Sequence, residues 1–127
     1  MTVEYYLTSA TDPIMARIVA KRVNAKYLDK MDVDFLALGK EYHDKFVYMI
    51  NDDVEQGKAA VERMKSGAVS AGTKDPRMVY LNPLEALDRF RKDHPDVVIT
   101  DYNMKRKFNI QGSDVIRKMK EMETQLG

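Results

Sequence analysis

The feature that most constrains the fold is the segment of residues 96–104, Asp-Val-Val-Ile-Thr-Asp-Tyr-Asn-Met. Its apolar residues 97–99 form a short uninterrupted run, which is typical of a strand buried on both faces of a parallel sheet. The run follows His94-Pro95, where a helix-like segment must end, because proline cannot continue a helix. Asp101 stands at the end of this strand, and open α/β sheets place their sites at the carboxyl ends of strands. The segment therefore predicts a parallel α/β sheet with a candidate site at Asp101.

The rest of the chain alternates between strand and helix signals. Runs of β-branched and aromatic residues predict five strands, at residues 3–7, 26–29, 46–50, 78–81 and 97–101. Asp12-Pro13 and Asn82-Pro83 are typical helix starts, and residues 54–66 predict a helix that is followed by a loop over 66–76. This alternation predicts one doubly wound α/β domain over residues 1–127, with parallel strands joined by right-handed crossovers. Helix periodicity predicts that the helix after Asp12 turns one face inward, formed by Ile14, Met15, Ile18, Val19 and Val23.

Composition excludes several functional classes. With 21 basic and 20 acidic residues, nothing predicts binding to nucleic acid or to an anionic membrane. The absence of cysteine and the presence of only two histidines argue against disulfides and against a zinc site. No apolar run approaches the ~20 residues of a membrane span and no signal peptide is visible, so we expect a cytoplasmic protein.

Polar side chains follow four of the five predicted strands. They are Thr8, Lys30, the pair Asp52-Asp53, and Asp101 with Asn103. Each has a simpler structural interpretation, such as a helix cap or a solvated charge. Because the carboxyl ends of parallel strands meet at one edge, however, the four groups together favour a functional site. Mg²⁺ would relieve the repulsion between carboxylates there, since it takes hard oxygen ligands.

These residues resemble a known family. Residues 96–104, followed by Gly-Ser-Asp-Val-Ile-Arg-Lys-Met-Lys at 112–120, resemble the third strand and third helix of a bacterial response-regulator receiver domain. Residues 7–13 resemble its fourth strand and the following helix start, and residues 26–30 resemble its fifth strand. Residues 46–53 resemble its first strand with the acidic pair. The resemblance covers essentially the whole chain and implies a flavodoxin-like fold.

The order of these segments is permuted relative to the family. Residues 1–45 resemble the family's C-terminal part and residues 46–127 its N-terminal part. The resemblance therefore implies a circular permutation in which strands four and five precede strands one to three. It also implies the spatial order 4-3-5-1-2, with strands numbered along this chain.

The resemblance implies a role for each site residue. Asp101 would accept a phosphoryl group, Lys30 would pair with the phosphoryl oxygens, and Thr8 would move to hydrogen-bond them. Tyr27 would swing inward as Thr8 moves. Mg²⁺ would be held by the acidic pair, by Asp101 and by the backbone carbonyl of Asn103. The acidic pair is either Asp52-Asp53 or Asn51-Asp52, because helix periodicity favours the first and strand alternation also allows the second.

The implied function is two-component signal transduction. A sensor histidine kinase or a phosphotransfer protein would supply the phosphoryl group, and residues 13–44 would form the face that switches a target protein or joins a homodimer. Activity would be limited to self-phosphorylation from a phosphodonor and autodephosphorylation. Met31 stands where the family usually has proline after the lysine, so a degenerate receiver that binds protein without phosphorylation is the alternative. A flavin or nucleotide site is disfavoured, because no strand is followed by a glycine-rich phosphate loop.

Overall fold

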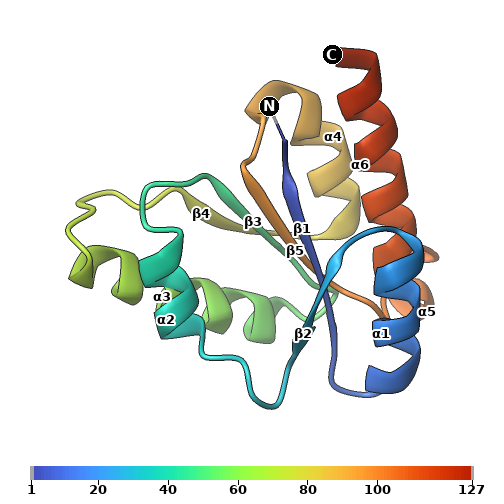
Figure 1. Ribbon diagram of the computed structural model, residues 1–127, viewed down its shortest axis with the longest axis horizontal. Coiled ribbons are helices and arrows are strands. Elements are labelled where there is room, and N and C mark those ends of the chain that lie inside the picture. Colours follow the sequence, from blue (N-terminus) through green and yellow to red (C-terminus); the bar gives the residue numbers. More distant parts are fainter. Residues whose placement is uncertain (1, 127) are drawn as a thin grey trace.

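A five-stranded parallel sheet lies at the centre of the protein in a computed structural model that describes residues 2–126 (Figure 1). The strand order across the sheet is β2-β1-β5-β3-β4, which reads 4-3-5-1-2 from the other edge. β1 pairs with β2 on one side and with β5 on the other. The strands are β1 (Glu4–Ser9), β2 (Lys26–Asp29), β3 (Val47–Ile50), β4 (Met78–Leu81) and β5 (Val97–Asp101). The predicted parallel α/β architecture is confirmed.

Helices cover both faces of the sheet. On one face lie α1 (Pro13–Arg22), α4 (Pro83–Asp93) and α6 (Gly112–Leu126), and on the other lie α2 (Phe35–Glu41) and α3 (Val54–Ser70) (Figure 1). A further short helix, α5 (Lys105–Phe108), follows β5. None of the helices within residues 2–126 combines the length and hydrophobicity needed to cross a membrane.

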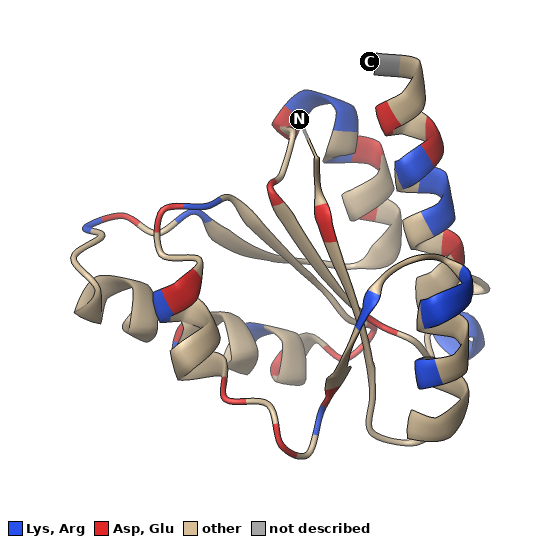
Figure 2. Cartoon of the chain, in the orientation of Figure 1, with Lys and Arg blue, Asp and Glu red and all other residues tan. Residues whose placement is uncertain are grey.

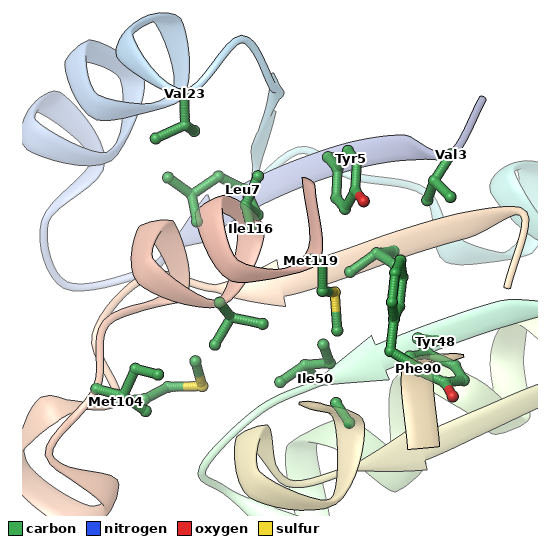
Figure 3. Close-up of a cluster of buried hydrophobic side chains, with 14 of the residues drawn as sticks. Val3, Tyr5, Leu7, Val23, Tyr48, Ile50, Phe90, Met104, Ile116 and Met119 are labelled. Atoms are coloured by element: carbon green, nitrogen blue, oxygen red, sulfur yellow. The ribbon is translucent and has the colours of Figure 1, made fainter. Parts of the chain in front are cut away.

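Each face of the sheet has its own hydrophobic core, because successive side chains of a strand point to opposite faces. The apolar run of β5 illustrates this, since Val98 joins one core while Val97 and Ile99 join the other. Figure 3 shows the first core, where Leu7 and Tyr48 of the sheet meet side chains of α4 and α6. Fully burying one aliphatic side chain of this kind stabilises the fold by roughly 1.5–3 kcal/mol. The second core is formed mainly by Val47, Met49, Met64, Ala68, Val97 and Ile99.

The two chain ends lie next to each other, at the end of the sheet opposite the strand carboxyl termini (Figure 1). The amide of Val3 donates a hydrogen bond to Glu123 Oε1 of α6 at 3.1 Å. The hydroxyl of Tyr5 donates to the other carboxylate oxygen of Glu123 at 2.6 Å. Burial and these contacts with Glu123 raise the pKa of Tyr5 well above its usual range, so its hydroxyl stays protonated and remains a donor. The first strand and the last helix are therefore fastened together.

Side-chain caps explain where most helices begin. Asp12, Asp34 and Asp53 each accept a hydrogen bond from a backbone amide three residues further on, at the start of α1, α2 and α3. Asn82 forms a reciprocal capping box with Glu85 at the start of α4. The predicted helix starts at Asp12-Pro13 and Asn82-Pro83 are confirmed.

The predicted inward face of α1 is partly wrong. Val19 and Val23 are buried as expected, together with the small residues Ala16 and Ala20. Ile14 is 76% exposed, however, and Met15 and Ile18 are also largely exposed. The helix buries a stripe formed by Ala16, Val19 and Ala20, and its larger apolar side chains lie on the exposed side.

The predicted end of α3 at residue 66 is also wrong, because the helix continues to Ser70. Its backbone is in close contact with α2 at two glycines. A Cβ added to Gly39 would lie 2.0 Å from the carbonyl oxygen of Met64, and one added to Gly67 would lie 2.0 Å from that of Leu36. Gly67 therefore serves helix packing and does not end the helix, and Gly39 is likewise a packing residue of α2.

Candidate functional site

The carboxyl ends of β1, β2, β3 and β5 surround a cleft of about 540 Å³. The loop after β3 and the end of β5 contribute acidic residues, while Lys30 and the residues of α5 contribute basic ones. Figure 2 shows both kinds of charge at this edge of the molecule. The side chains that line the cleft include Lys30, Asp52, Asp53, Asp101, Asn103 and Lys107. The structure thus brings most of the predicted site residues into one cleft.

Asp101 is the last residue of β5 and is only 7% exposed. Burial raises the pKa of its carboxyl group above the usual aspartate range, and the charge of Asp52 adds to this effect. The Lys30 ammonium and the backbone amide of Tyr102 act in the opposite direction and do not fully compensate. A nearly buried carboxylate with incomplete charge compensation favours binding of an additional cation or of a neutralising group.

Lys30 reaches Asp101 from the neighbouring side of the cleft. Its Nζ lies 3.4 Å from Asp101 Oδ1 and donates a second hydrogen bond, of 3.0 Å, to Gln56 Oε1. A tight turn fixes its backbone, because Asp29 accepts a hydrogen bond from the amide of Met31 through its side chain. Lys30 therefore reaches Asp101 even though Met31 follows it.

The acids after β3 differ in what their side chains do. The carboxylate of Asp53 caps α3 by accepting a hydrogen bond from the amide of Gln56 at 3.1 Å. The side chain of Asn51 is buried and accepts a hydrogen bond from the amide of Asp53 at 2.9 Å. Asp52 is the residue of this loop whose charge acts on Asp101. Asp52 is thus the acid whose charge acts on Asp101, while Asp53, which also lines the cleft, uses one carboxylate oxygen to cap α3.

Thr8 lies directly beside Asp101 in the sheet, because the two residues are register partners of β1 and β5. Its side chain is 4% exposed, and its hydroxyl has no hydrogen-bonding partner among residues 2–126. In the described part of the chain, the one other buried side-chain polar atom without a partner is the hydroxyl of Tyr27, in the adjacent strand β2. The ring of Tyr27 is held by the guanidinium of Arg17, which lies 5.0 Å from the ring centroid. Buried polar groups are normally satisfied, so these two hydroxyls require an explanation.

Asn103 connects two walls of the cleft. Its side-chain amide donates a hydrogen bond to Thr11 Oγ1 at 2.7 Å and a longer one to Ser9 Oγ at 3.4 Å. The loop after β5 is thereby joined to the loop after β1. The contact partners Thr11 and Gln56 were not among the predicted site residues, since neither lies in a sequence pattern that marks a site.

The oxygen donors of the cleft suit Mg²⁺ in type. Mg²⁺ is commonly bound through one or two carboxylates and keeps several waters for a phosphate ligand, and Asp52 and Asp101 line the same cleft. Within residues 2–126, however, no three acidic or histidine side chains are grouped closely enough to form a metal site by themselves.

Comparisons with protein-family models, with curated proteins and with solved structures found no match to this chain.

Proposed function

We propose that the chain is a receiver domain in circularly permuted order. The sheet order supports this, because β3, β4, β5, β1 and β2, taken as the family's strands one to five, give the flavodoxin-like order 2-1-3-4-5 across the sheet. The contact between Val3 and Glu123 also supports it, since chain ends that lie side by side are the condition under which circular permutation is tolerated.

Asp101 is the phosphoacceptor in this proposal. It lies at the carboxyl end of a central strand, in a cleft open to a donor, and Lys30 stands 3.4 Å away. A carboxylate oxygen of Asp101 attacks the phosphorus of a phosphohistidine in line with the leaving nitrogen. The P–N bond breaks as the new P–O bond forms, and the imidazole takes up a proton. Catalysis of this kind rests mainly on positioning and charge stabilisation.

The observation that carries the proposal is the pair of unpartnered hydroxyls at Thr8 and Tyr27. A phosphoryl group on Asp101 would bring acceptor oxygens next to Thr8, whose hydroxyl has no partner before phosphorylation. Movement of Thr8 toward it would open space for Tyr27, which lies one strand further out. The two groups left unsatisfied in the fold are thus the two that the switch would use.

The remaining charges act on the phosphoryl group. Lys30 pairs with the phosphoryl oxygens and loses its present partner, because the Asp101 carboxylate becomes an acyl phosphate. Asp52, Asp101 and the carbonyl of Asn103 would hold Mg²⁺, which supplies charge neutralisation of the phosphoryl oxygens when bound. The phosphodonor would be a sensor histidine kinase or a phosphotransfer protein, and the target would bind the face of α1 and β2.

A second candidate is a degenerate receiver that binds protein without phosphorylation. It is favoured by the occupation of Asp53 as a helix cap and by the lack of a three-acid group within residues 2–126. The exposed apolar side chains of α1 would then bind a partner constitutively.

NMR spectra with and without beryllofluoride, a mimic of the aspartyl phosphate, in the presence of Mg²⁺ separate the two candidates. The receiver predicts chemical-shift changes that spread from Asp101 through Thr8 and Tyr27 to α1. The degenerate module predicts no change, or a change confined to the cleft. The Thr8→Ala variant is the control, because it should retain the changes around Asp101 and lose those at Tyr27.

A further inference from the structure

The segment after β5 carries three consecutive basic residues, Lys105, Arg106 and Lys107, on the rim of the cleft. The segment is anchored at both ends. Met104 before it is fully buried, and Ile110 after it is also buried. In addition, Gln111 Oε1 accepts hydrogen bonds of 3.3 Å from the amides of Met104 and Lys105. The three cations are therefore held beside the cleft and are not carried by a free loop.

Lys107 reaches across the cleft to the opposite wall. Its Nζ donates a hydrogen bond of 3.1 Å to the backbone carbonyl of Asp52, in the loop after β3. Lys30 reaches Asp101 from the side of β2. Two ammonium groups from different elements thus contact the two residues between which a divalent ion would be expected to lie.

The cleft is lined by one more basic residue than acidic residues, four against three. In a chain without the Asp101 carboxylate the balance would be four against two, which favours an anion. The basic side chains are Lys30, Lys105, Arg106 and Lys107, and the acidic ones are Asp52, Asp53 and Asp101. A tetrahedral oxyanion is a good ligand for such a set, because ammonium groups make strong charge-assisted hydrogen bonds to phosphate oxygens.

We propose that Lys107 and Lys30 form an oxyanion-binding pair that lets the cleft bind phosphate or a phosphomonoester without a divalent cation. The proposal rests on the proposed function for the position of the ligand, next to Asp101. The new element is Lys107, to which we assign part of the charge neutralisation that a metal would otherwise supply. Lys107 then also opposes metal binding, because its ammonium repels a divalent cation placed near Asp52.

The test is a titration of the full chain with inorganic phosphate in the presence of EDTA, followed by NMR. The Asp101→Asn variant is titrated in parallel, since it removes the repulsive carboxylate and cannot be phosphorylated. We expect saturable binding that is tighter in Asp101→Asn. The additional change Lys107→Ala should weaken it by about tenfold or more, the loss expected for one charge-assisted hydrogen bond.

Lys118→Ala is the matched control, because it removes the same charge from an exposed position on α6, away from the cleft. In the wild-type background, Lys107→Ala should bind Mg²⁺ several-fold more tightly than Lys118→Ala.

Equal phosphate affinity of the Lys107→Ala and Lys118→Ala variants would overturn the proposal, as would the absence of phosphate binding in EDTA. Both outcomes are independent of phosphorylation, because they are read in a variant without the acceptor carboxylate. A chain that binds phosphate through Lys107 but is never phosphorylated would leave this inference standing and refute the proposed function.

Discussion

Replacement of Thr8 by valine should stabilise the protein, although it removes a polar group from the candidate site. The Thr8 hydroxyl is buried and has no hydrogen-bonding partner among residues 2–126. A buried unsatisfied donor costs about 1–3 kcal/mol, and valine has nearly the same shape without the hydroxyl. We therefore expect the free energy of unfolding to rise by about 1 kcal/mol or more, and the melting temperature to rise by about 3–5 °C for a domain of this size.

Thr100→Val is the matched control. Thr100 is fully buried in the neighbouring strand, but its hydroxyl donates a hydrogen bond of 3.1 Å to the carbonyl of Asp101. Removing that hydroxyl should cost about 1 kcal/mol. Urea denaturation of both variants, without Mg²⁺ or phosphodonor, measures the difference. If Thr8→Val were no more stable than Thr100→Val, the Thr8 hydroxyl would not be an unsatisfied group, and Thr8 would have no unpaired hydroxyl to offer a phosphoryl group.

Three further changes test other parts of the structure. Gly39→Ala should destabilise the protein by about 2 kcal/mol or more in urea denaturation, because its Cβ would lie 2.0 Å from the Met64 carbonyl oxygen. A gain of stability, which is the usual result for Gly→Ala within a helix, would contradict the close approach of α2 and α3. Asp101→Asn should become more stable relative to wild type as the pH rises, because burial raises the pKa of Asp101 and its ionised form opposes folding. Melting temperatures of both proteins from acidic to neutral pH check this. If the melting-temperature advantage of Asp101→Asn over wild type shrank with rising pH, the prediction would be wrong. Tyr27→Phe should leave stability unchanged or raise it, because the Tyr27 hydroxyl has no partner; a loss above about 1 kcal/mol in thermal denaturation would indicate a hydrogen bond that the structure lacks.

The strands could be predicted because each is a short run of strand-forming residues bounded by clear breaks. β5 is the best example, since Pro95 precedes it and a polar stretch begins at Asp101. The helix starts at Asp12 and Asn82 were equally predictable, because a cap followed by proline is a local signal. Features of this kind depend on neighbours in sequence, so they can be found without the structure.

Features that depend on contacts between distant elements could not be predicted. Gly67 has the local appearance of a helix end, and its packing against Leu36 becomes visible only when α2 and α3 are placed together. Ile14 and Ile18 fit an inward face by periodicity, but the sheet accepts the smaller stripe at Ala16 and Ala20 instead. Periodicity that counts only large apolar residues misses a face built from alanine.

The candidate site also contains both kinds of feature, those set by sequence neighbours and those set by contacts between distant elements. Asp101 and Lys30 were predicted from strand ends, and the structure brings them together at 3.4 Å. Asn51 and Asp53 each accept a hydrogen bond from a backbone amide, whereas the charge of Asp52 acts on Asp101, and these roles are visible only in the folded chain. The contact from Lys107 to the carbonyl of Asp52 joins α5 to the loop after β3, and no sequence spacing indicates it.

Whether Asp101 accepts a phosphoryl group is measured by the intact mass of the protein after incubation with acetyl phosphate and Mg²⁺. We expect one added phosphoryl group on the wild-type chain, none on Asp101→Asn, and slower addition on Lys30→Ala. No added mass on the wild-type chain, or an equal addition on Asp101→Asn, would contradict this expectation.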